Sequence, residues 1–290
     1  MRFIALAVAL GLLLVGCATP EPVTSVRTLT SGGVERSYIV TVPSDLDGSV
    51  PLVVMLHGGF GSAKQAQSAY GWDELAVSDG FVVVYPDGLG KAWNAGGGCC
   101  GTSGSAGVDD VAFIREVVRA VSRSVDIDAE RVFVTGMSNG AMMSYRLACD
   151  TDIFAAIAPV AGTVLGECDD PQPTSVLHIH GLSDDSVHYD GTPGNGAVRI
   201  DGMPILELNA LWRTVDGCPE PTITESAPVT TSTARCGSHD VTLLSVEGAG
   251  HQWPGSTVSR AQVRLGADEP SDALDATAEI WEFFEQHSQD

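Results

Sequence analysis

Basic residues are scarce in this sequence of 290 residues. It contains 15 Lys and Arg against 37 Asp and Glu, which gives a formal net charge of −22 at pH 7. A chain this acidic repels phosphate backbones and anionic lipid surfaces. The composition therefore argues against a nucleic-acid-binding protein.

Long hydrophobic runs are also lacking. Beyond residue 15, no apolar stretch approaches the roughly 18 residues that a transmembrane helix needs. Residues 3–15 are apolar and follow Met1-Arg2, which is typical of a secretory signal. The sequence LVGC at residues 14–17 resembles a bacterial lipobox.

We therefore predict a signal peptide over residues 1–16, cleavage before Cys17, and lipid attachment to that cysteine. Residues 17–30 would carry the lipid and act as a tether. Residues 31–290 would form one domain at the cell envelope, outside the cytoplasm and in contact with a membrane only through the anchor. The alternative is an ordinary secretory signal with a chance cysteine, which gives a secreted protein.

Motifs for zinc and for nucleotides are missing. There is no pair of C-x-x-C motifs, which argues against a zinc ribbon. The segment GGFGSAK at residues 58–64 lacks the G-x-x-x-x-G-K-[ST] spacing of a phosphate-binding loop. We expect neither a metal nor a cofactor.

Cysteines are present in a number that favours disulfides. Six remain after Cys17, and an even number in an oxidising compartment suggests bridges, although six cysteines allow 15 connectivities. Cys218 and Cys236 bracket a polar loop and form the most natural pair. A bridge between Cys149 and Cys168 is a weaker hypothesis, and the pairing of the adjacent residues 99 and 100 stays open.

Expected strands alternate with expected helices along the chain. Apolar or alternating runs predict strands at residues 34–43, 51–57, 81–86, 132–135, 155–160, 175–180 and 241–246. Helices are expected at residues 68–79, from 109 or 110 to about 125, 141–148, 204–215 and 271–287. This alternation predicts an α/β fold with a mostly parallel sheet and helices on both faces. Residues 190–240 are otherwise irregular and could cover part of a site as a lid.

Residues 131–150 have the pattern of a nucleophile elbow. A β-branched strand ends in Gly-Met-Ser-Asn-Gly, and apolar residues at helical spacing follow. A serine on such a strained turn needs neighbours without bulk two positions before and after it. Ser138 is therefore the candidate nucleophile.

A serine nucleophile needs a base and an acid that orients the base. In this fold class they follow in the order Ser, Asp or Glu, then His, at the ends of later strands. Asp184 and Asp185 come shortly after the strand at 175–180, and His251 follows the strand at 241–246. We assign His251 as the base and favour Asp184 over Asp185 as the acid, because it is the first acid beyond the strand.

Two backbone N–H groups are candidates for an oxyanion hole. One comes from the Gly58-Gly59 pair after a buried strand, and the other from Asn139, which follows the nucleophile. Trp93 and Trp253 could stack on a substrate ring or else pack in the core.

The histidines at positions 178 and 180 lie two apart on an expected strand and therefore on one face. This spacing could suggest a metal, but no third ligand is evident. We expect two hydrogen-bonded structural histidines near the site.

Together, these segments resemble the polyhydroxybutyrate depolymerase-like esterases, a group related to feruloyl and acetylxylan esterases of carbohydrate esterase family 1. The likeness covers roughly residues 35–287 and lies in YPDG, KAWNAGGGCCG, GVDDVAFI, RVFVTGMSNGAMMSYRLAC, FAAIAPVAG, LHIHG and GAGHQWPG. It implies an α/β-hydrolase fold and a serine esterase without a cofactor. It assigns Ser138, Asp184 and His251 to a triad, Gly59 and Asn139 to the oxyanion hole, and supports a Cys218–Cys236 bridge.

The sequence thus predicts an extracellular serine esterase that acts through an acyl-enzyme, and we expect a monomer. Its substrates would be feruloyl or acetyl esters of polysaccharide, or short polyhydroxyalkanoate esters. Two alternatives are a non-catalytic glycan- or lipid-binding lipoprotein on the same fold, and a serine peptidase.

Overall fold

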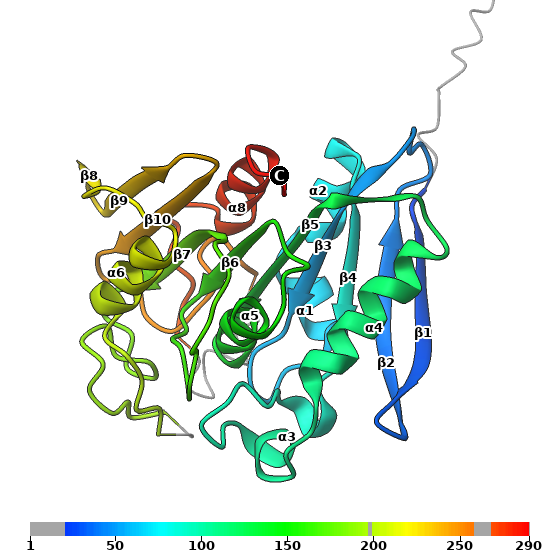
Figure 1. Cartoon of the computed structure of the whole chain (residues 1–290), viewed down its shortest axis with the longest axis horizontal. Helices are drawn as coiled ribbons and strands as arrows, with labels where there is room; N and C mark the ends of the chain where they lie inside the picture. The colour runs from blue at the N-terminus through cyan, green and yellow to red at the C-terminus, as the bar shows by residue number, and fades with distance from the viewer. Residues whose placement is uncertain (1–20, 197–198, 258–267, 290) are drawn as a thin grey trace, which may run out of the picture.

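A ten-stranded sheet organises the chain in a computed structural model, which describes residues 21–196, 199–257 and 268–289. The strand order is β1-β2-β4-β3-β5-β6-β7-β10-β9-β8 (Figure 1). The strands are β1 (Val23–Ser31), β2 (Val34–Val42), β3 (Val50–Leu56), β4 (Val82–Pro86), β5 (Ile127–Met137), β6 (Ala156–Val160), β7 (Ser175–Gly181), β8 (Thr222–Ser226), β9 (Val229–Cys236) and β10 (His239–Val246). The helical segments are α1 (Ala63–Ala69), α2 (Trp72–Asp79), η1 (Leu89–Lys91), α3 (Gly101–Ser105), α4 (Asp110–Ser122), α5 (Asn139–Asp150), α6 (Ile205–Val215) and α8 (Ala276–Glu285).

The six central strands, from β4 to β10 in the sheet, run parallel. The sequence of β3 is continuously apolar because every one of its residues is buried. Val54 points into the core on one face of the sheet, and Val53 points into the core on the other. Parallel strands need crossover helices that cover both faces. The predicted mostly parallel sheet with helices on both faces is therefore confirmed.

At one edge the sheet begins earlier than the sequence predicted. Strand β1 pairs with β2 along its full length, from Val23 opposite Val42 to Ser31 opposite Val34. The interpretation of residues 17–30 as a tether is therefore wrong for residues 23–30. The strand is rich in Thr and Ser and lies at the exposed edge of the sheet, so it lacks the apolar run that marks a central strand.

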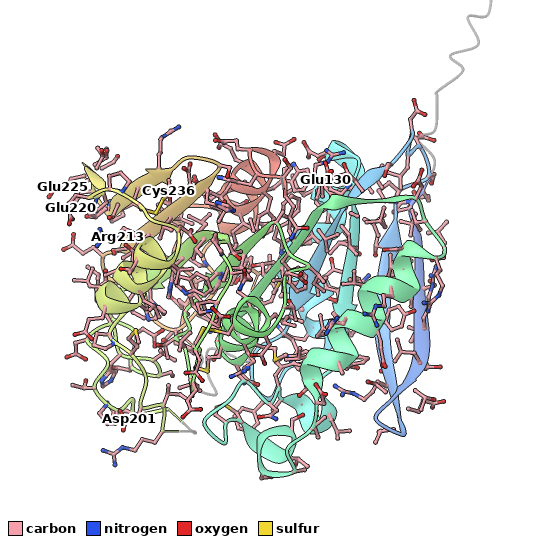
Figure 2. The ribbon with its side chains drawn as sticks, in the orientation of Figure 1. Glu130, Asp201, Arg213, Glu220, Glu225 and Cys236 are labelled. Carbon is pink, nitrogen blue, oxygen red and sulfur yellow. A yellow bond between two sulfur atoms is a disulfide. The ribbon has the colours of Figure 1, made fainter. Side chains whose placement is uncertain are left out.

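At the other edge, β8 and β9 form an antiparallel hairpin beside β10. We expected residues 190–240 to be irregular apart from one helix, and this is wrong for the hairpin. All five residues of β8 are exposed, so its sequence lacks the apolar pattern that identifies a buried strand. Figure 2 shows Glu220 and Glu225 at this outer margin of the molecule.

Three disulfides cross-link the described part of the chain. The Cys218–Cys236 bridge ties the segment after α6 to the end of β9, as predicted. The hypothesis of a Cys149–Cys168 bridge is also confirmed. The residues whose pairing stayed open, Cys99 and Cys100, are bonded to each other.

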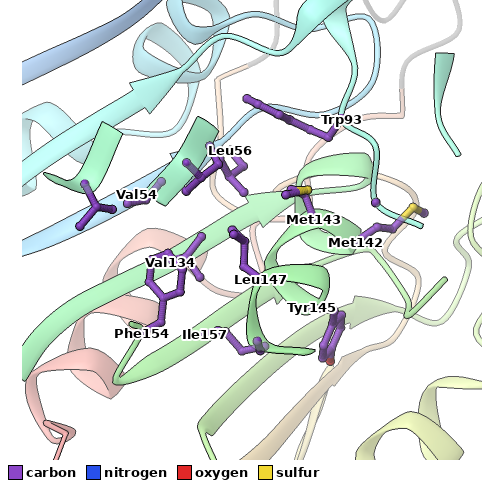
Figure 3. Close-up of a cluster of buried hydrophobic side chains, with 14 of the residues drawn as sticks. Val54, Leu56, Trp93, Val134, Met142, Met143, Tyr145, Leu147, Phe154 and Ile157 are labelled. Atoms are coloured by element: carbon purple, nitrogen blue, oxygen red, sulfur yellow. The ribbon is translucent and has the colours of Figure 1, made fainter. Parts of the chain in front are cut away.

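Two layers of helices sandwich the sheet. Helices α4, α5 and α6 pack on one face, and α1, α2 and α8 pack on the other (Figure 1). Figure 3 shows part of the first core, where Leu147 of α5 lies near Val134 of β5. The central strands contribute side chains to both cores, and this packing fixes their carboxyl ends. The loops that follow these strands therefore start from fixed positions.

The expected helix at residues 68–79 is instead two helices, α1 and α2. Gly71 separates them in a left-handed conformation with φ 74°, which glycine adopts without steric cost. Among the described residues, no helix is long and apolar enough to cross a membrane. The predicted signal peptide at residues 1–16 and the lipidation site Cys17 lie outside the described residues.

Candidate active site

Ser138 lies between the end of β5 and the start of α5, in the strained turn that the sequence predicted. Its backbone has φ 56° and ψ −117°, a region that costs a non-glycine residue about 1–3 kcal/mol. A Cβ atom on Gly136 would lie 2.5 Å from the backbone of Gly140, and one on Gly140 would lie 2.3 Å from the carbonyl oxygen of Leu56. Both positions therefore require glycine, because the turn packs directly against its own helix and against β3.

The structure brings Ser138 together with His251 and Asp184. The Nε2 atom of His251 lies 2.8 Å from the Ser138 hydroxyl, and its Nδ1 atom lies 2.8 Å from Oδ2 of Asp184. These residues are far apart in the sequence and follow β5, β7 and β10, whose parallel packing places their carboxyl ends at one edge of the sheet. In this arrangement the imidazole can take the proton of the hydroxyl, while the carboxylate orients the imidazole.

Asp184, and not Asp185, supplies the carboxylate that contacts His251. The Asp184 side chain is fully buried, and its Oδ1 accepts N–H groups of Ser186 and Val187 at 2.8 Å each. Burial acts to raise the pKa of Asp184, but the hydrogen bond and charge of His251, with smaller contributions from its other neighbours, hold it below its ordinary value. The carboxylate is therefore kept ionised, while Asp185 is exposed to solvent.

Asp268 fixes the backbone of His251, a contact that the sequence did not predict. Its Oδ2 accepts the His251 N–H at 2.6 Å. A Cβ atom on the preceding residue, Gly250, would lie 2.4 Å from the same oxygen. The glycine before His251 therefore gives Asp268 room to approach, and no pattern of spacing in the sequence links the two segments.

Gly59 and Asn139 lie beside each other at the site. An added Cβ on Gly59 would be 3.9 Å from Cβ of Asn139, and the first N–H groups of a helix such as α5 have no acceptor within it. His57 orders this loop: its Nδ1 donates to the Gly58 carbonyl at 2.8 Å and its Nε2 accepts the Gly88 N–H at 2.9 Å. Burial lowers the pKa of His57 and so favours the neutral ring that this arrangement requires.

The glycine-rich segment at residues 87–108 is tied to the elbow by side chains. The Asn139 amide accepts the Trp93 N–H at 2.7 Å and donates to the Trp93 carbonyl at 3.1 Å. Asp110, at the start of α4, accepts from Arg36, from the Asn94 N–H and from the Ser103 hydroxyl, each at 2.8 Å. These bonds hold the segment against the loop that carries Ser138.

The two tryptophans pack in the core, the second of the roles considered for them. Trp93 is completely buried and donates its indole N–H to the His57 carbonyl at 2.8 Å; it is labelled in Figure 3. Trp253 is 1% exposed, stacks on Tyr70, and donates to the Thr277 hydroxyl at 3.1 Å. Because both rings are buried, neither has a free face on which a substrate could stack in this arrangement, and of the two roles considered the structure favours packing in the core.

Part of the predicted lid segment packs beside the elbow. The Thr163 hydroxyl, in the loop after β6, donates to the Met203 carbonyl at 2.9 Å. Gly162 in the same loop lies against the Ser138 carbonyl, since a Cβ atom there would be 3.1 Å from it. The segment before α6 therefore borders the site; its movement as a lid stays a prediction.

The parallel sheet, the strained serine turn and the loops at the carboxyl ends of the strands define an α/β-hydrolase. Among solved structures, the fold is similar to an acetyl xylan esterase from Aspergillus awamori, with a TM-score of 0.61 and 17% identity over 83% of this chain and 97% of that chain. It is also similar to a thermostable esterase, with a TM-score of 0.58 and 17% identity over 92% of this chain and 63% of that one.

The sequence places the chain in a particular family. The profile of the family "Esterase PHB depolymerase" matches residues 36–204, and the chain belongs to this esterase family. It is 31% identical to feruloyl esterase B of Piromyces equi over 74% of this chain and 42% of that protein. It is 30% identical to feruloyl esterase C of Emericella nidulans over 89% of this chain and 87% of that protein.

A third relative is the bifunctional acetylxylan esterase/xylanase XynS20E of Neocallimastix patriciarum, at 32% identity over 56% of this chain. The chain spans 23% of that protein and less than half of feruloyl esterase B.

Proposed function

We propose that this protein is a carboxylic ester hydrolase in which Ser138, His251 and Asp184 form the catalytic triad. The observation that supports this most is the unbroken line of hydrogen bonds from the Ser138 hydroxyl through His251 to Asp184, with 2.8 Å at each step. Membership of an esterase family agrees with it.

In the proposed mechanism, His251 takes the proton of Ser138 as the hydroxyl oxygen attacks the ester carbonyl. The N–H groups of Gly59 and Asn139 stabilise the oxyanion of the tetrahedral intermediate. His251 then gives its proton to the leaving alcohol, which produces an acyl-enzyme. A water molecule, deprotonated by His251, then attacks the acyl group. His251 returns this proton to the Ser138 oxygen as the acid is released. Asp184 holds the imidazole and stabilises its positive charge throughout.

The proposed substrates are feruloyl or acetyl esters of polysaccharide, or short polyhydroxyalkanoate esters. Relatives named feruloyl esterase and acetylxylan esterase support the first two, and the family name supports the third. We further propose an extracytoplasmic protein held by a lipid on Cys17. Three disulfides support an oxidising compartment.

The test uses the mature protein with Cys17 replaced, compared with its Ser138→Ala variant. Both are incubated with methyl ferulate, acetylated xylan and a 3-hydroxybutyrate oligomer, and the released acids are quantified. We expect release that falls by about 10⁴-fold or more in the variant. Ferulate or acetate release indicates a role in polysaccharide breakdown, and hydroxybutyrate release alone indicates a polyester substrate.

Labelling by a fluorophosphonate separates the remaining outcomes. Labelled wild type without activity on the three substrates retains the esterase proposal with another ester. Folded wild type that reacts neither with the label nor with any ester contradicts the proposal and favours a binding protein.

A further inference from the structure

Behind the Asp184 carboxylate lies a row of buried polar rings that the mechanism above does not use. Tyr145 of α5 and His178 and His180 of β7 are each 1% exposed. The Tyr145 hydroxyl lies 2.8 Å from Nδ1 of His178, and Nε2 of His178 lies 3.0 Å from Nδ1 of His180. We call these three residues the buried array.

The array exists because of the alternation along β7. Ile179 points into the core under α8, whereas His178 and His180 point to the opposite face, which α5 and α6 cover. Tyr145 reaches the sheet from the inner side of α5 (Figure 3) and stacks on Trp212 of α6. Every polar atom of the three side chains has a partner, so burial leaves none of them unsatisfied.

The hydrogen bond from His180 to the Val187 carbonyl determines which nitrogen atoms of the array carry protons. Nε2 of His180 lies 2.9 Å from the Val187 carbonyl, which can only accept, so this nitrogen carries a proton. In a neutral ring Nδ1 of His180 then accepts from His178, and Nδ1 of His178 accepts from Tyr145. Burial lowers the pKa of both histidines and raises that of Tyr145, which agrees with neutral rings and a protonated phenol.

The array ends at the proposed triad acid. Nε2 of His180 also lies 3.4 Å from Oδ2 of Asp184, the same oxygen that binds His251. The Val187 residue that accepts from His180 donates its own N–H to the other oxygen of Asp184. His180 is therefore hydrogen-bonded to the turn that carries Asp184, and its N–H lies close to the carboxylate itself.

We propose that His180, supported by His178 and Tyr145, is a positioning residue that fixes the Asp184 carboxylate in line with His251. The inference rests on the proposed function, because it assigns a role to residues behind the same triad. His180 does not touch the reacting atoms and acts only through Asp184.

The test compares His180→Leu, which cannot donate, with His180→Gln, which can keep an N–H near the Nε2 position. The readouts are kcat and KM for 4-nitrophenyl acetate per active site titrated with a fluorophosphonate, together with the pH dependence of kcat/KM. Wild-type activity that is lost in Ser138→Ala establishes the proposed function independently of the array.

For His180→Leu we expect kcat to fall about 10-fold or more at unchanged KM. The acid limb of kcat/KM should move to higher pH. Without the nearby N–H the Asp184 anion is less stabilised, so this carboxylate takes up a proton at a higher pH. The groups that face His180 are His178, Asp184, His251 and Tyr189. His180→Gln should recover most of the kcat.

Tyr145→Phe keeps the ring and its stacking, and so tests the array if His180→Leu does not fold. We expect a smaller loss of kcat and a shift of the acid limb in the same direction. Tyr189→Phe is the matched control, since it removes a hydroxyl bonded to Ser245, beside His180 but outside the array. The proposal is overturned if folded, titrated His180→Leu or Tyr145→Phe keeps the wild-type kcat and pH profile while Ser138→Ala is inactive.

Discussion

At the scale of single residues, two adjacent aspartates differ only in what surrounds them. Asp184→Asn should lower kcat by about 10⁴-fold, because the amide can present its N–H to Nδ1 of His251 and so stabilise the wrong tautomer of the imidazole. The measurement is the steady-state hydrolysis of 4-nitrophenyl acetate, with circular dichroism to establish folding.

Asp185→Asn is the matched control for this substitution. Its side chain is exposed, whereas that of Asp184 is fully buried. It should retain the wild-type kcat. If Asp185→Asn is the variant that loses activity, the assignment of the acid is wrong.

Among the secondary structure elements, α4 depends on a buried ion pair at its first residue. Arg36 and Asp110 lie 2.8 Å apart with side chains that are 3% and 0% exposed. Asp110→Asn should lower the free energy of unfolding by about 3 kcal/mol or more, because it leaves the Arg36 charge buried without a counter-charge. Urea denaturation followed by circular dichroism measures this loss.

The neighbouring N-cap provides the control for α4. Asp109 accepts the Ala112 N–H from an exposed position, and Asn caps helices about as well as Asp. Asp109→Asn should therefore change the free energy of unfolding by less than about 0.5 kcal/mol. Equal losses in the two variants would contradict the role given to the buried pair.

A second prediction at this scale concerns the end of α6. Asp216 accepts the Thr174 N–H at 3.1 Å, and burial raises its pKa to about 7. Because an aspartate side chain in an unfolded chain has a pKa of about 3.9, the folded protein binds this proton more tightly. Stability should therefore fall as the pH rises from about 4 to about 7.

Asp216→Asn removes this dependence. Relative to wild type, the variant should gain in Tm at pH 8 and gain less, or nothing, at pH 5. Thermal melts at the two pH values measure the difference. A gain of the same size at both would show that titration of Asp216 does not contribute.

The sequence predicts those strands that are buried, because burial requires a recognisable run of apolar residues. Strand β3 is buried on both faces and is recognisable from its apolar run, whereas β8 is exposed along its whole length and was missed. At the site, Ser138 and His251 follow from chain order and strand ends. The contact of Asp268 with the His251 backbone depends on how two loops pack, and no local pattern encodes that.

On the scale of the whole molecule, two apolar cores lie inside a surface with a large excess of negative charge. The formal net charge is −22, and acidic residues such as Asp201, Glu220 and Glu225 lie at the outer margin (Figure 2). Some of this charge is paired locally, as between Arg213 and Glu220 at 3.4 Å. Because the sequence has 15 basic residues for 37 acidic ones, there are too few basic side chains to pair with every carboxylate. Folding therefore brings negatively charged side chains closer together.

We therefore expect the protein to gain stability with salt. Repulsion between exposed carboxylates opposes the compact state, and salt weakens it as the Debye length falls from about 10 Å at 0.1 M to about 3 Å at 1 M. Thermal melts in NaCl should show Tm rising, with most of the rise below about 0.3 M because screening saturates. A rise that instead continues in proportion to concentration would indicate exclusion of salt from the surface, and a Tm that is flat or falling below 0.3 M would show that self-repulsion does not limit this fold.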